Sequence, residues 1–431
     1  MTRRSRTALK LGVALLAGGL WAAPGGVAQA ATWCGTVAPT DRAPQLPAGQ
    51  SVHAVYAVPS DLPDRSPQIA QQLLDDAERI DVWWRREDPS RTLRFDLFPY
   101  PCGAQLDVTM VRVPQSSSSL RPVNGRFESI LGAMTAAGLT SRYEKYLVYY
   151  DGPTDPLPSG FQVCGQGGQL PGGLGVSMVY LGACEGVPTA PTAAHEILHG
   201  LGAVPIGAPH ACPDGDTAHV CDTESDIMYP FASGETLDPL VLDAGHDDYY
   251  AHPGPWPDVQ DSPWLVFLNS QIRLALELTG TGSVQSDIPG LDCSSACSTD
   301  WNTGTKLGLT ATPAKGQRLL RWTGACSGSG LCAVDLSQAA NVGAVFGPAT
   351  FRLSVARTGR GTVRGARGAI DCGSKCAAAV RSYTATALTA TAAKGWRFRS
   401  WAGACNGTRP TCALPMTAAS AARATFVRRR S

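Results

Sequence analysis

The chain has 431 residues, enough for two or three domains, and contains 36 Lys and Arg against 35 Asp and Glu. Only 16% of the residues are charged, which argues against a charged coiled coil, and 44% hydrophobic residues argue against wholesale disorder. The near-neutral total hides a division, because the net charge is −16 over residues 31–275, −1 over 276–348 and +14 over 349–431.

The first thirty residues have the pattern of a secretion signal. Three arginines and one lysine lie among the first ten residues, an apolar stretch covers Leu11–Trp21, and Ala28-Gln29-Ala30 provides a small-residue cleavage site. The apolar stretch is too short to span a bilayer, and no later run of 18 apolar residues follows. We expect residues 1–30 to be removed and the mature protein to be secreted and extracellular, without a transmembrane segment; an uncleaved anchor is the alternative.

Residues 31–275 are predicted to alternate between strands and helices, as in an α/β (α+β) domain. One helix should begin at Ser66-Pro67, where an apolar stripe with helical spacing starts, and a second should cover 126–137. The Gly-rich segment 159–175 is predicted to be a loop, and Trp264–Leu276 either follows a linker or forms a closing helix. Strands are expected over Val52–Val58, Leu93–Phe98, Leu106–Val113, Lys145–Asp151 and Val176–Leu181.

Two histidines four residues apart follow the last of these strands. In His195-Glu196-Ile197-Leu198-His199, helical spacing puts both imidazoles on one face, where they can bind one Zn²⁺. Glu196 is then beside the water on that metal and can act first as a base and then as an acid. This segment predicts a catalytic zinc site, with two ordinary helix histidines as the alternative.

Further residues resemble those of a known family. Gly202, three residues after His199, allows a sharp turn at the helix end. Ser225-Asp226-Ile227-Met228-Tyr229-Pro230 is similar to the methionine-containing turn below the zinc of metzincin peptidases. The resemblance covers about residues 50–235. It implies a zinc endopeptidase whose mixed sheet and two helices frame the cleft, with an edge strand near Val176–Leu181 that holds an extended substrate by β-augmentation.

The sequence departs from the metzincin pattern at the third histidine. The family's spacing places that ligand at Pro205, and proline cannot bind zinc. His219 lies nine residues before Met228, an interval similar to that of the matrixin branch. We expect His219 to be the third ligand, with His210 as its rival and Asp222 as a more distant alternative.

The cysteines are predicted to form disulfides rather than a zinc knuckle. Their number, fourteen, is even, and none of them has CxxC spacing. Cys212 and Cys221 flank the segment that carries both rival histidines and are expected to pair, with Cys164 or Cys184 as alternative partners.

Weaker signals lie elsewhere in residues 31–275. Cys34 is expected to pair with Cys102, and its alternative role is a thiolate that caps the zinc. The cluster around Asp243, Asp247 and Asp248 is expected to be a solvated loop, with a Ca²⁺ site as the alternative. The remaining histidines expected to be structural are His53 and His252.

The last part of the chain is an internal repeat. Two motifs recur 79 residues later: Leu291-Asp292-Cys293 as Ile370-Asp371-Cys372, and Trp322-Thr323-Gly324-Ala325-Cys326 as Trp401-Ala402-Gly403-Ala404-Cys405. The segments between them alternate and are rich in Thr, which predicts strands, and disulfides and the Trp should hold each small unit together. The pattern resembles the divergent internalin-B-type repeat modules of bacteria. We expect two disulfide-bonded β-rich repeats, at 276–348 and 349–431.

The second repeat is expected to bind anions. Its charge of +14 predicts salt-sensitive attraction to an anionic cell-surface polymer. Residues 349–431 contain no recognisable motif for reading nucleic acid, so no specific nucleic-acid partner is expected. A soluble basic module without a partner is the alternative.

Together these patterns predict a secreted zinc-dependent metalloendopeptidase that acts on a protein or peptide substrate. Glu196 would assist the attack of a zinc-bound water on the peptide bond. The alternative from another class is a surface-binding protein whose zinc site is structural and whose basic tail is the working part. Glu196 favours the enzyme, because a structural site would need a fourth ligand rather than a base. Zinc-dependent hydrolysis of a non-peptide bond is a third possibility.

Overall fold

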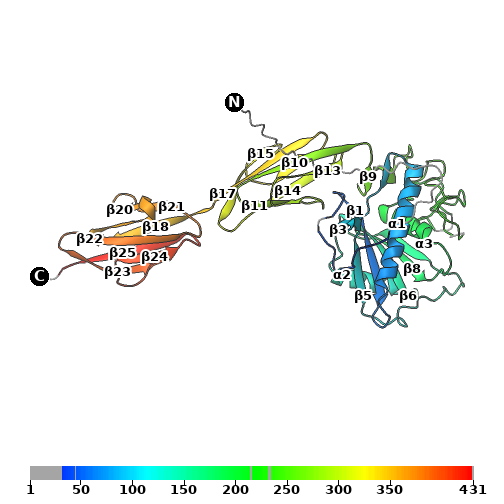
Figure 1. The fold of residues 1–431 in the computed structure, drawn as a ribbon, viewed down its shortest axis with the longest axis horizontal. Coiled ribbons are helices and arrows are strands. Elements are labelled where there is room, and N and C mark those ends of the chain that lie inside the picture. Colours follow the sequence, from blue (N-terminus) through cyan, green and yellow to red (C-terminus); the bar gives the residue numbers. More distant parts are fainter. Residues whose placement is uncertain (1–31, 44, 214–215, 232–233, 430–431) are drawn as a thin grey trace, which may run out of the picture. The chain divides into compact units, whose positions relative to one another are not determined.

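The computed structural model describes residues 32–43, 45–213, 216–231 and 234–429 (Figure 1). The predicted signal at residues 1–30 lies outside these ranges. In the ranges described, no helix combines the length and apolarity that a bilayer crossing needs. All three α-helices of this part of the chain lie before Gly202, and the remainder is built from strands, short turns and loops.

A five-stranded mixed sheet forms the centre of the N-terminal part, in the order β5-β1-β6-β8-β7. The first four strands are parallel to their neighbours, and β7 runs antiparallel to β8 at the edge. The strands are β1 (Ser51–Pro59), β5 (Val108–Val113), β6 (Glu144–Pro153), β7 (Gly165–Gln169) and β8 (Gly175–Gly182).

Helices cover both faces of this sheet. Helices α1 (Ser66–Glu87) and α3 (Thr189–Leu201) pack on one face, and α2 (Arg126–Ala136) packs on the other. Because both faces are covered, every residue of β1 is buried. Successive side chains of β1 alternate between the two cores, with Val52, Ala54, Tyr56 and Val58 in the first and Val55 and Ala57 in the second.

Helix α1 begins at Ser66-Pro67, as the sequence predicts. Proline fits in the first turn, where the backbone N–H has no partner within the helix. The predicted apolar stripe is buried in the core and consists of Ile69, Leu73, Ala77, Ile80 and Trp84.

The Gly-rich segment predicted as a loop contains strand β7. Since β8 lies between β6 and β7, the edge strand is Gly165–Gln169, and the expectation of an edge at Val176–Leu181 is wrong. Three of the five residues of β7 are glycine. Glycine weakens a strand and has a low strand propensity, so propensity alone does not predict β7.

Two predicted strands are each divided. The segment 93–98 contains the end of β2 (Arg91–Leu93) and the start of β3 (Leu97–Tyr100), and 106–113 contains the end of β4 (Gly103–Leu106) before β5. Strands β3 and β4 pair as a hairpin. The breaks fall at Asp96 and Asp107, which are buried polar residues with side-chain partners elsewhere in the fold.

Residues 264–276 do not form a closing helix. Strand β9 (Leu265–Phe267) pairs with β2, and β10 (Gln271–Thr279) pairs with strands of the first repeat. Strand β10 therefore runs across the expected boundary at residue 275. Its buried residues, Leu274 and Leu276, alternate with less buried ones, which is a strand pattern.

Each repeat contains two four-stranded sheets, and the second repeat has the same strand order as the first. Trp322 and Trp401 occupy equivalent places in the two cores and are 2% and 4% exposed. In the first repeat, β13-β10-β17-β15 faces β12-β11-β14-β16, built from β11 (Gly282–Ser286), β12 (Asp292–Cys293), β13 (Cys297–Asn302), β14 (Lys306–Pro313), β15 (Gln317–Gly324), β16 (Cys332–Asp335) and β17 (Ala340–Pro348). In the second, β21-β18-β25-β23 faces β20-β19-β22-β24, built from β18 (Thr350–Thr358), β19 (Gly361–Gly365), β20 (Ile370–Cys372), β21 (Ala377–Arg381), β22 (Ala385–Ala392), β23 (Trp396–Gly403), β24 (Thr411–Pro415) and β25 (Ser420–Arg428).

All fourteen cysteines are paired in seven disulfides. Cys34 bonds to Cys102, so no thiolate is available there to cap a metal. The expected pairing of Cys212 with Cys221 is confirmed. The complete set is Cys34–Cys102, Cys164–Cys184, Cys212–Cys221, Cys293–Cys297, Cys326–Cys332, Cys372–Cys376 and Cys405–Cys412.

Candidate metal centre

Three histidine side chains converge at the open side of α3. The Nε2 atom of His199 lies 3.0 Å from Nε2 of His195 and 3.2 Å from Nε2 of His219, and the His195 and His219 atoms are 3.2 Å apart. One ion bound about 2.1 Å from three ring nitrogens in tetrahedral geometry holds them about 3.4 Å apart. The three imidazoles therefore fit a zinc ion.

Helix α3 places two of these rings because His195 and His199 are one turn apart. The helix is anchored by its buried apolar residues and by the Ser177 hydroxyl, which donates to the carbonyl of Glu196 at 2.8 Å. It ends at Gly202, whose left-handed φ of 91° turns the chain so that the N–H of Ala203 reaches the carbonyl of Leu198 at 2.9 Å. The turn that the sequence predicts at Gly202 is present.

The other ring nitrogens of His195 and His219 are held by oxygens. Nδ1 of His195 lies 2.6 Å from the carbonyl oxygen of Ile227, and Nδ1 of His219 lies 2.7 Å from a carboxylate oxygen of Asp216. A ring that donates from Nδ1 leaves the lone pair of Nε2 free to bind a metal. These contacts aim the two Nε2 lone pairs at the same point.

Burial keeps two of the imidazoles uncharged. It lowers the pKa of His195 to about 4 and, with repulsion from the neighbouring histidines, lowers the pKa of His199 to about 2. Both rings are therefore neutral at neutral pH, which is the form that binds a metal ion.

Glu196 is the buried acid of this centre. The residue is 5% exposed, and its Oε2 atom has no hydrogen-bond partner. Burial raises the pKa of Glu196 well above its usual range, because desolvation disfavours the charged carboxylate. An unpartnered buried carboxyl oxygen is costly, and such groups concentrate at functional sites.

Strand β7 packs against Glu196 without side chains in between. A Cβ atom on Gly165 would lie 2.4 Å from Oε1 of Glu196. A Cβ atom on Gly167 would lie 2.8 Å from Oε2 of Glu196 and 3.1 Å from Cβ of His199. The glycines of β7 therefore let the edge of the sheet approach the acid closely.

His210 and Asp222 lie apart from the three histidines. The backbone N–H and Nδ1 of His210 lie 2.8 and 3.0 Å from the carboxylate of Asp248, and this hydrogen bonding raises the pKa of His210. Asp222 belongs to the same group. Among the predicted third ligands, only His219 meets His195 and His199.

A short disulfide-closed hairpin separates the two rivals. The N–H of Cys212 donates to the carbonyl of His219 at 2.8 Å, and the N–H of Cys221 donates to the carbonyl of His210 at 3.0 Å. The segments of His210 and His219 thus pair through the Ala211–Val220 bridge and are joined by the Cys212–Cys221 bond.

The side chain of Asp226 stabilises the methionine-containing turn, a role that was not predicted from the sequence. The Asp226 carboxylate accepts bonds from the N–H of Met228 at 2.7 Å, from the N–H of Ala244 at 2.7 Å and from the Tyr249 hydroxyl at 2.8 Å. Met228 is fully buried, and its carbonyl accepts from the N–H of Val220, next to His219. Asp226 lies two residues before Met228, a spacing typical of an Asx turn. This spacing is the sequence feature from which the role of Asp226 could have been predicted.

The cluster of Asp243, Asp247 and Asp248 is not a solvated loop. Asp243 and Asp248 are buried, and the Asp243 carboxylate accepts from the backbone N–H groups of Asp248, Tyr249 and Tyr250. The acid is used to stabilise a turn, which composition alone does not reveal.

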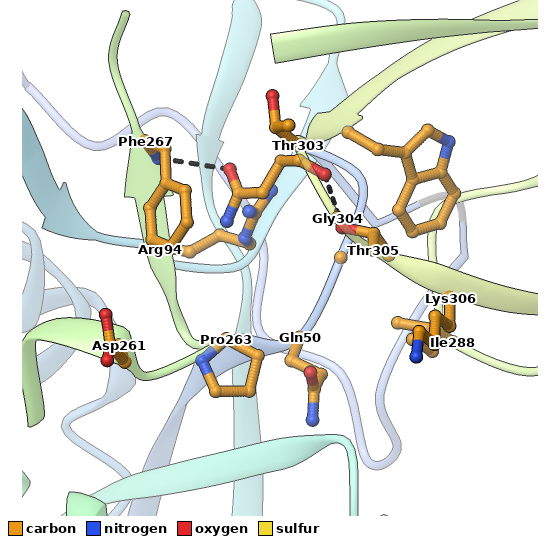
Figure 2. A pocket seen from close by; sticks show the side chains of 13 residues that line it. Gln50, Arg94, Asp261, Pro263, Phe267, Ile288, Thr303, Gly304, Thr305 and Lys306 are labelled. Carbon is orange, nitrogen blue, oxygen red and sulfur yellow. Dashed lines mark hydrogen bonds between the residues drawn. The ribbon is translucent and has the colours of Figure 1, made fainter. Parts of the chain in front are cut away.

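A separate hollow of about 370 Å³ lies beside Arg94, Phe267 and Thr303 (Figure 2). The guanidinium of Arg94 donates to the carbonyl of Leu265 at 3.2 Å, and burial lowers the pKa of Arg94 to about 10. None of the predicted site residues lines this hollow.

Comparison with known proteins identifies the repeats. The family model of the divergent InlB B-repeat domain matches residues 279–349 and 351–430, which confirms the repeat assignment. No curated protein matches the chain.

Solved structures show only remote likeness. The Bacillus anthracis TIE protein is 10% identical, with a TM-score of 0.24 over 37% of this chain, which spans only 34% of that protein. Wild-type OgpA from Akkermansia muciniphila is 12% identical, with a TM-score of 0.29 over 72% of this chain and 85% of that one. Catalytically inactive OgpA in complex with an O-glycopeptide substrate is 12% identical, with a TM-score of 0.28 over 69% and 87% of the two chains. Likeness at this level carries no conclusion about function.

Proposed function

We propose that residues 31–275 form a metzincin-like zinc metalloendopeptidase that is secreted and cleaves protein or peptide substrates. The observation that carries the proposal is the convergence of three Nε2 atoms within 3.2 Å of one another beside the buried acid Glu196. The order of the mixed sheet, the helix end at Gly202 and the buried Met228, in the turn that contacts His195, support the metzincin-like assignment.

The chain's own residues prepare this site for a metal. His195, His199 and His219 would hold the zinc, and the Ile227 carbonyl and the Asp216 carboxylate orient two of the rings. A zinc ion held there supplies a Lewis acid that polarises the peptide carbonyl and makes a bound water more acidic.

Glu196 would move the protons of the reaction. A nearby positive charge lowers a carboxyl pKa, so the carboxylate form of Glu196 can accept a proton from the attacking water. The same carboxyl group then donates that proton to the leaving amine. Its burial excludes bulk water as a competing proton acceptor.

The free edge of β7 is the best place for an extended substrate. Strand β7 ends the sheet, and Gly165 and Gly167 bring this strand against Glu196. A peptide added to this edge by backbone hydrogen bonds would lie close to the acid. This assigns substrate holding to Gly165–Gln169 in place of Val176–Leu181.

The structural-zinc alternative is less well supported. A closed structural site has four protein ligands, whereas no fourth His, Cys, Asp or Glu joins His195, His199 and His219 in the part of the chain that the structure describes. A buried acid without a partner is also unnecessary in a structural site.

The second repeat offers a basic surface for an anionic partner. Every arginine between residues 349 and 429 is exposed, and Arg364 is the only one of them that forms an ion pair with a carboxylate within the described residues. Arg352, Arg397 and Arg423 alternate with buried or half-buried residues on β18, β23 and β25, so their side chains extend from the outer face of one sheet. We propose that this face binds an anionic polymer at the cell surface. The seven disulfides are consistent with an extracellular location.

Digestion of casein and of a peptide library tests the enzymatic proposal. Zinc-loaded full-length protein should cleave both, a chelator should abolish cleavage, and added zinc should restore it. Stoichiometric zinc binding without cleavage of any peptide would reject the peptidase and favour the structural-zinc alternative.

A further inference from the structure

A second group of potential metal ligands is separate from the three histidines of the candidate metal centre and consists mainly of carboxylates. It contains Asp41 before the first strand, Asp96 between β2 and β3, Asp107 before β5, and His53 on β1. The side chains of His53, Asp96 and Asp107 are at most 1% exposed, and that of Asp41 is 27% exposed. This buried acidic group is separate from His195, His199 and His219.

Each of the three aspartates uses one carboxylate oxygen in a hydrogen bond and leaves the other without one, although Oδ1 of Asp41 also lies 3.5 Å from Nδ1 of His53. Oδ2 of Asp41 accepts from Gln45 at 2.8 Å, Oδ2 of Asp96 contacts Nδ1 of His53 at 2.8 Å, and Oδ1 of Asp107 accepts from Arg42 at 2.8 Å. The remaining oxygens are buried and have no hydrogen-bond partner: Asp41 Oδ1, Asp96 Oδ1 and Asp107 Oδ2.

Buried carboxylate oxygens without a hydrogen bond need an explanation. A buried polar atom without a partner costs free energy, and native proteins contain few of them. Candidate ligand atoms from Asp41, His53, Asp96 and Asp107 all lie within 4.8 Å of one another. Oxygens bound to one Ca²⁺ at about 2.4 Å are separated by at most about 4.8 Å, so the spacing suits a single ion.

The carboxylates of this group outnumber its positively charged partners, so a divalent cation would balance the excess negative charge. Glu144 is also buried beside these residues, where it accepts from Gln45 at 2.6 Å, so four carboxylates gather here. Arg42 and His53 are the positive partners that contact them. Burial is the main cause that raises the pKa of Asp41 to about 7 and that of Asp96 to about 6.

The donor atoms favour calcium over zinc. Both ring nitrogens of His53 already have partners, because Nδ1 contacts Asp96 and Nε2 lies 2.8 Å from the Thr109 hydroxyl. The atoms left for a metal are carboxylate oxygens, and Ca²⁺ binds oxygen ligands in flexible geometry. Mg²⁺ would require near-octahedral geometry and several retained waters.

We propose that the carboxylates of Asp41, Asp96 and Asp107 bind a structural Ca²⁺. The ion would connect three segments that are distant in sequence and would attach the residues before β1 to the sheet. This site serves stability and is independent of whether the histidine centre is catalytic.

Calorimetric titration and thermal unfolding of the chelator-treated full-length protein test this proposal. Added CaCl₂ should bind with one strong site per chain and raise the unfolding midpoint. Asp96→Asn should weaken Ca²⁺ binding at least about tenfold, because it removes one of three charged ligands. Asp247→Asn, in the other acidic cluster, should bind Ca²⁺ as the wild type does and serves as the matched control.

The same measurements can overturn it. Absence of strong Ca²⁺ binding to the wild type, or loss of binding in Asp247→Asn with retention in Asp96→Asn, would reject the site. Asp41→Asn, at the partly exposed edge of the cluster, is the second variant and should also bind Ca²⁺ more weakly. Retention of wild-type affinity in Asp41→Asn and Asp96→Asn together would reject the assignment of these ligands.

Discussion

Nδ1 of His195 lies 2.6 Å from the carbonyl oxygen of Ile227, thirty-two residues further along the chain. This contact joins the helix that carries two of the candidate ligands to the turn that buries Met228. The same turn also contacts the segment of His219, because the N–H of Val220 donates a hydrogen bond to the Met228 carbonyl. The third histidine and the first are therefore positioned by one element.

Replacement of Glu196 should separate metal binding from catalysis. Glu196→Gln keeps the size of the side chain but cannot accept a proton, so peptide cleavage should fall by at least about a hundredfold. Zinc content, measured by metal analysis, should stay near one ion per chain. Cleavage at close to the wild-type rate would show that Glu196 is not the base.

The two rival histidines should behave differently when replaced by alanine. His219→Ala removes a converging Nε2 atom and should lose zinc affinity severely, whereas His210→Ala should retain zinc because its side chain contacts Asp248 instead. Competition with a chromogenic chelator measures both affinities. Full retention in His219→Ala would refute its assignment as a ligand.

A pair of glycines in β7 provides a steric test. A Cβ atom at Gly167 would lie 2.6 Å from the backbone oxygen of Glu196, so Gly167→Ala must displace β7 or α3. We expect a loss of about 1–3 kcal/mol in unfolding free energy and a decrease in kcat/KM on the order of a hundredfold. Gly168→Ala is the control, since nothing lies within 4 Å of its added Cβ. Equal effects of the two substitutions would contradict this account.

His53 should make stability depend on pH. Burial lowers the pKa of His53, but hydrogen bonding to Asp96 and the charges of Asp96, Asp41 and Glu144 outweigh it and raise the pKa to about 9. The folded-state pKa exceeds the ordinary value of about 6.5, so the stabilisation is complete below that pH and is lost as pH rises through about 9.

Urea unfolding of chelator-treated protein between pH 6.5 and pH 9 measures this effect. The wild type should lose up to about 1.4 kcal/mol per pH unit more than His53→Gln does. His252→Gln, at a histidine that stacks on Trp256 near the surface, should keep the wild-type slope. Parallel pH curves for the wild type and His53→Gln would exclude a charged His53.

The basic repeat should bind anionic surfaces in a salt-dependent way. Full-length protein in which Arg352, Arg397 and Arg423 are changed to Gln should elute from an anionic polymer at lower salt than the wild type, because three exposed charges are lost. The control removes the same charge from arginines that are already paired with acids, namely Arg65, Arg85 and Arg121. Equal elution of the two triple variants would show that net charge, rather than this face, controls binding.

Local patterns were enough to predict much of the fold. The apolar stripe of α1, the one-turn spacing of His195 and His199 and the repeated cysteine motifs are properties of short segments, and the structure contains each of them. The edge strand could not be predicted in this way. Gly165 and Gly167 are explained by the closeness of Glu196, a contact between segments about thirty residues apart.

The third histidine shows a similar limit. Pro205 stands where the metzincin spacing places the third zinc ligand, so that spacing does not identify the ligand here. His210 and His219 are both close to the helix in sequence. The choice depends on the hairpin closed by Cys212 and Cys221, which places the two histidines on its two paired segments. Likewise, Asp96 and Asp107 appear in the sequence as two unremarkable acids in predicted strands, and only folding brings them to Asp41.

The disulfides also bear on how the protein can be made. Along the chain, the first cysteine bonds to the second, the third to the fourth, and so on without exception through Cys405–Cys412. A chain that emerges N-terminus first therefore presents to each thiol its native partner as the next thiol to appear. Oxidation in order of emergence gives the native pairing directly, so an oxidant is sufficient and thiol–disulfide exchange to correct wrong bonds is not required.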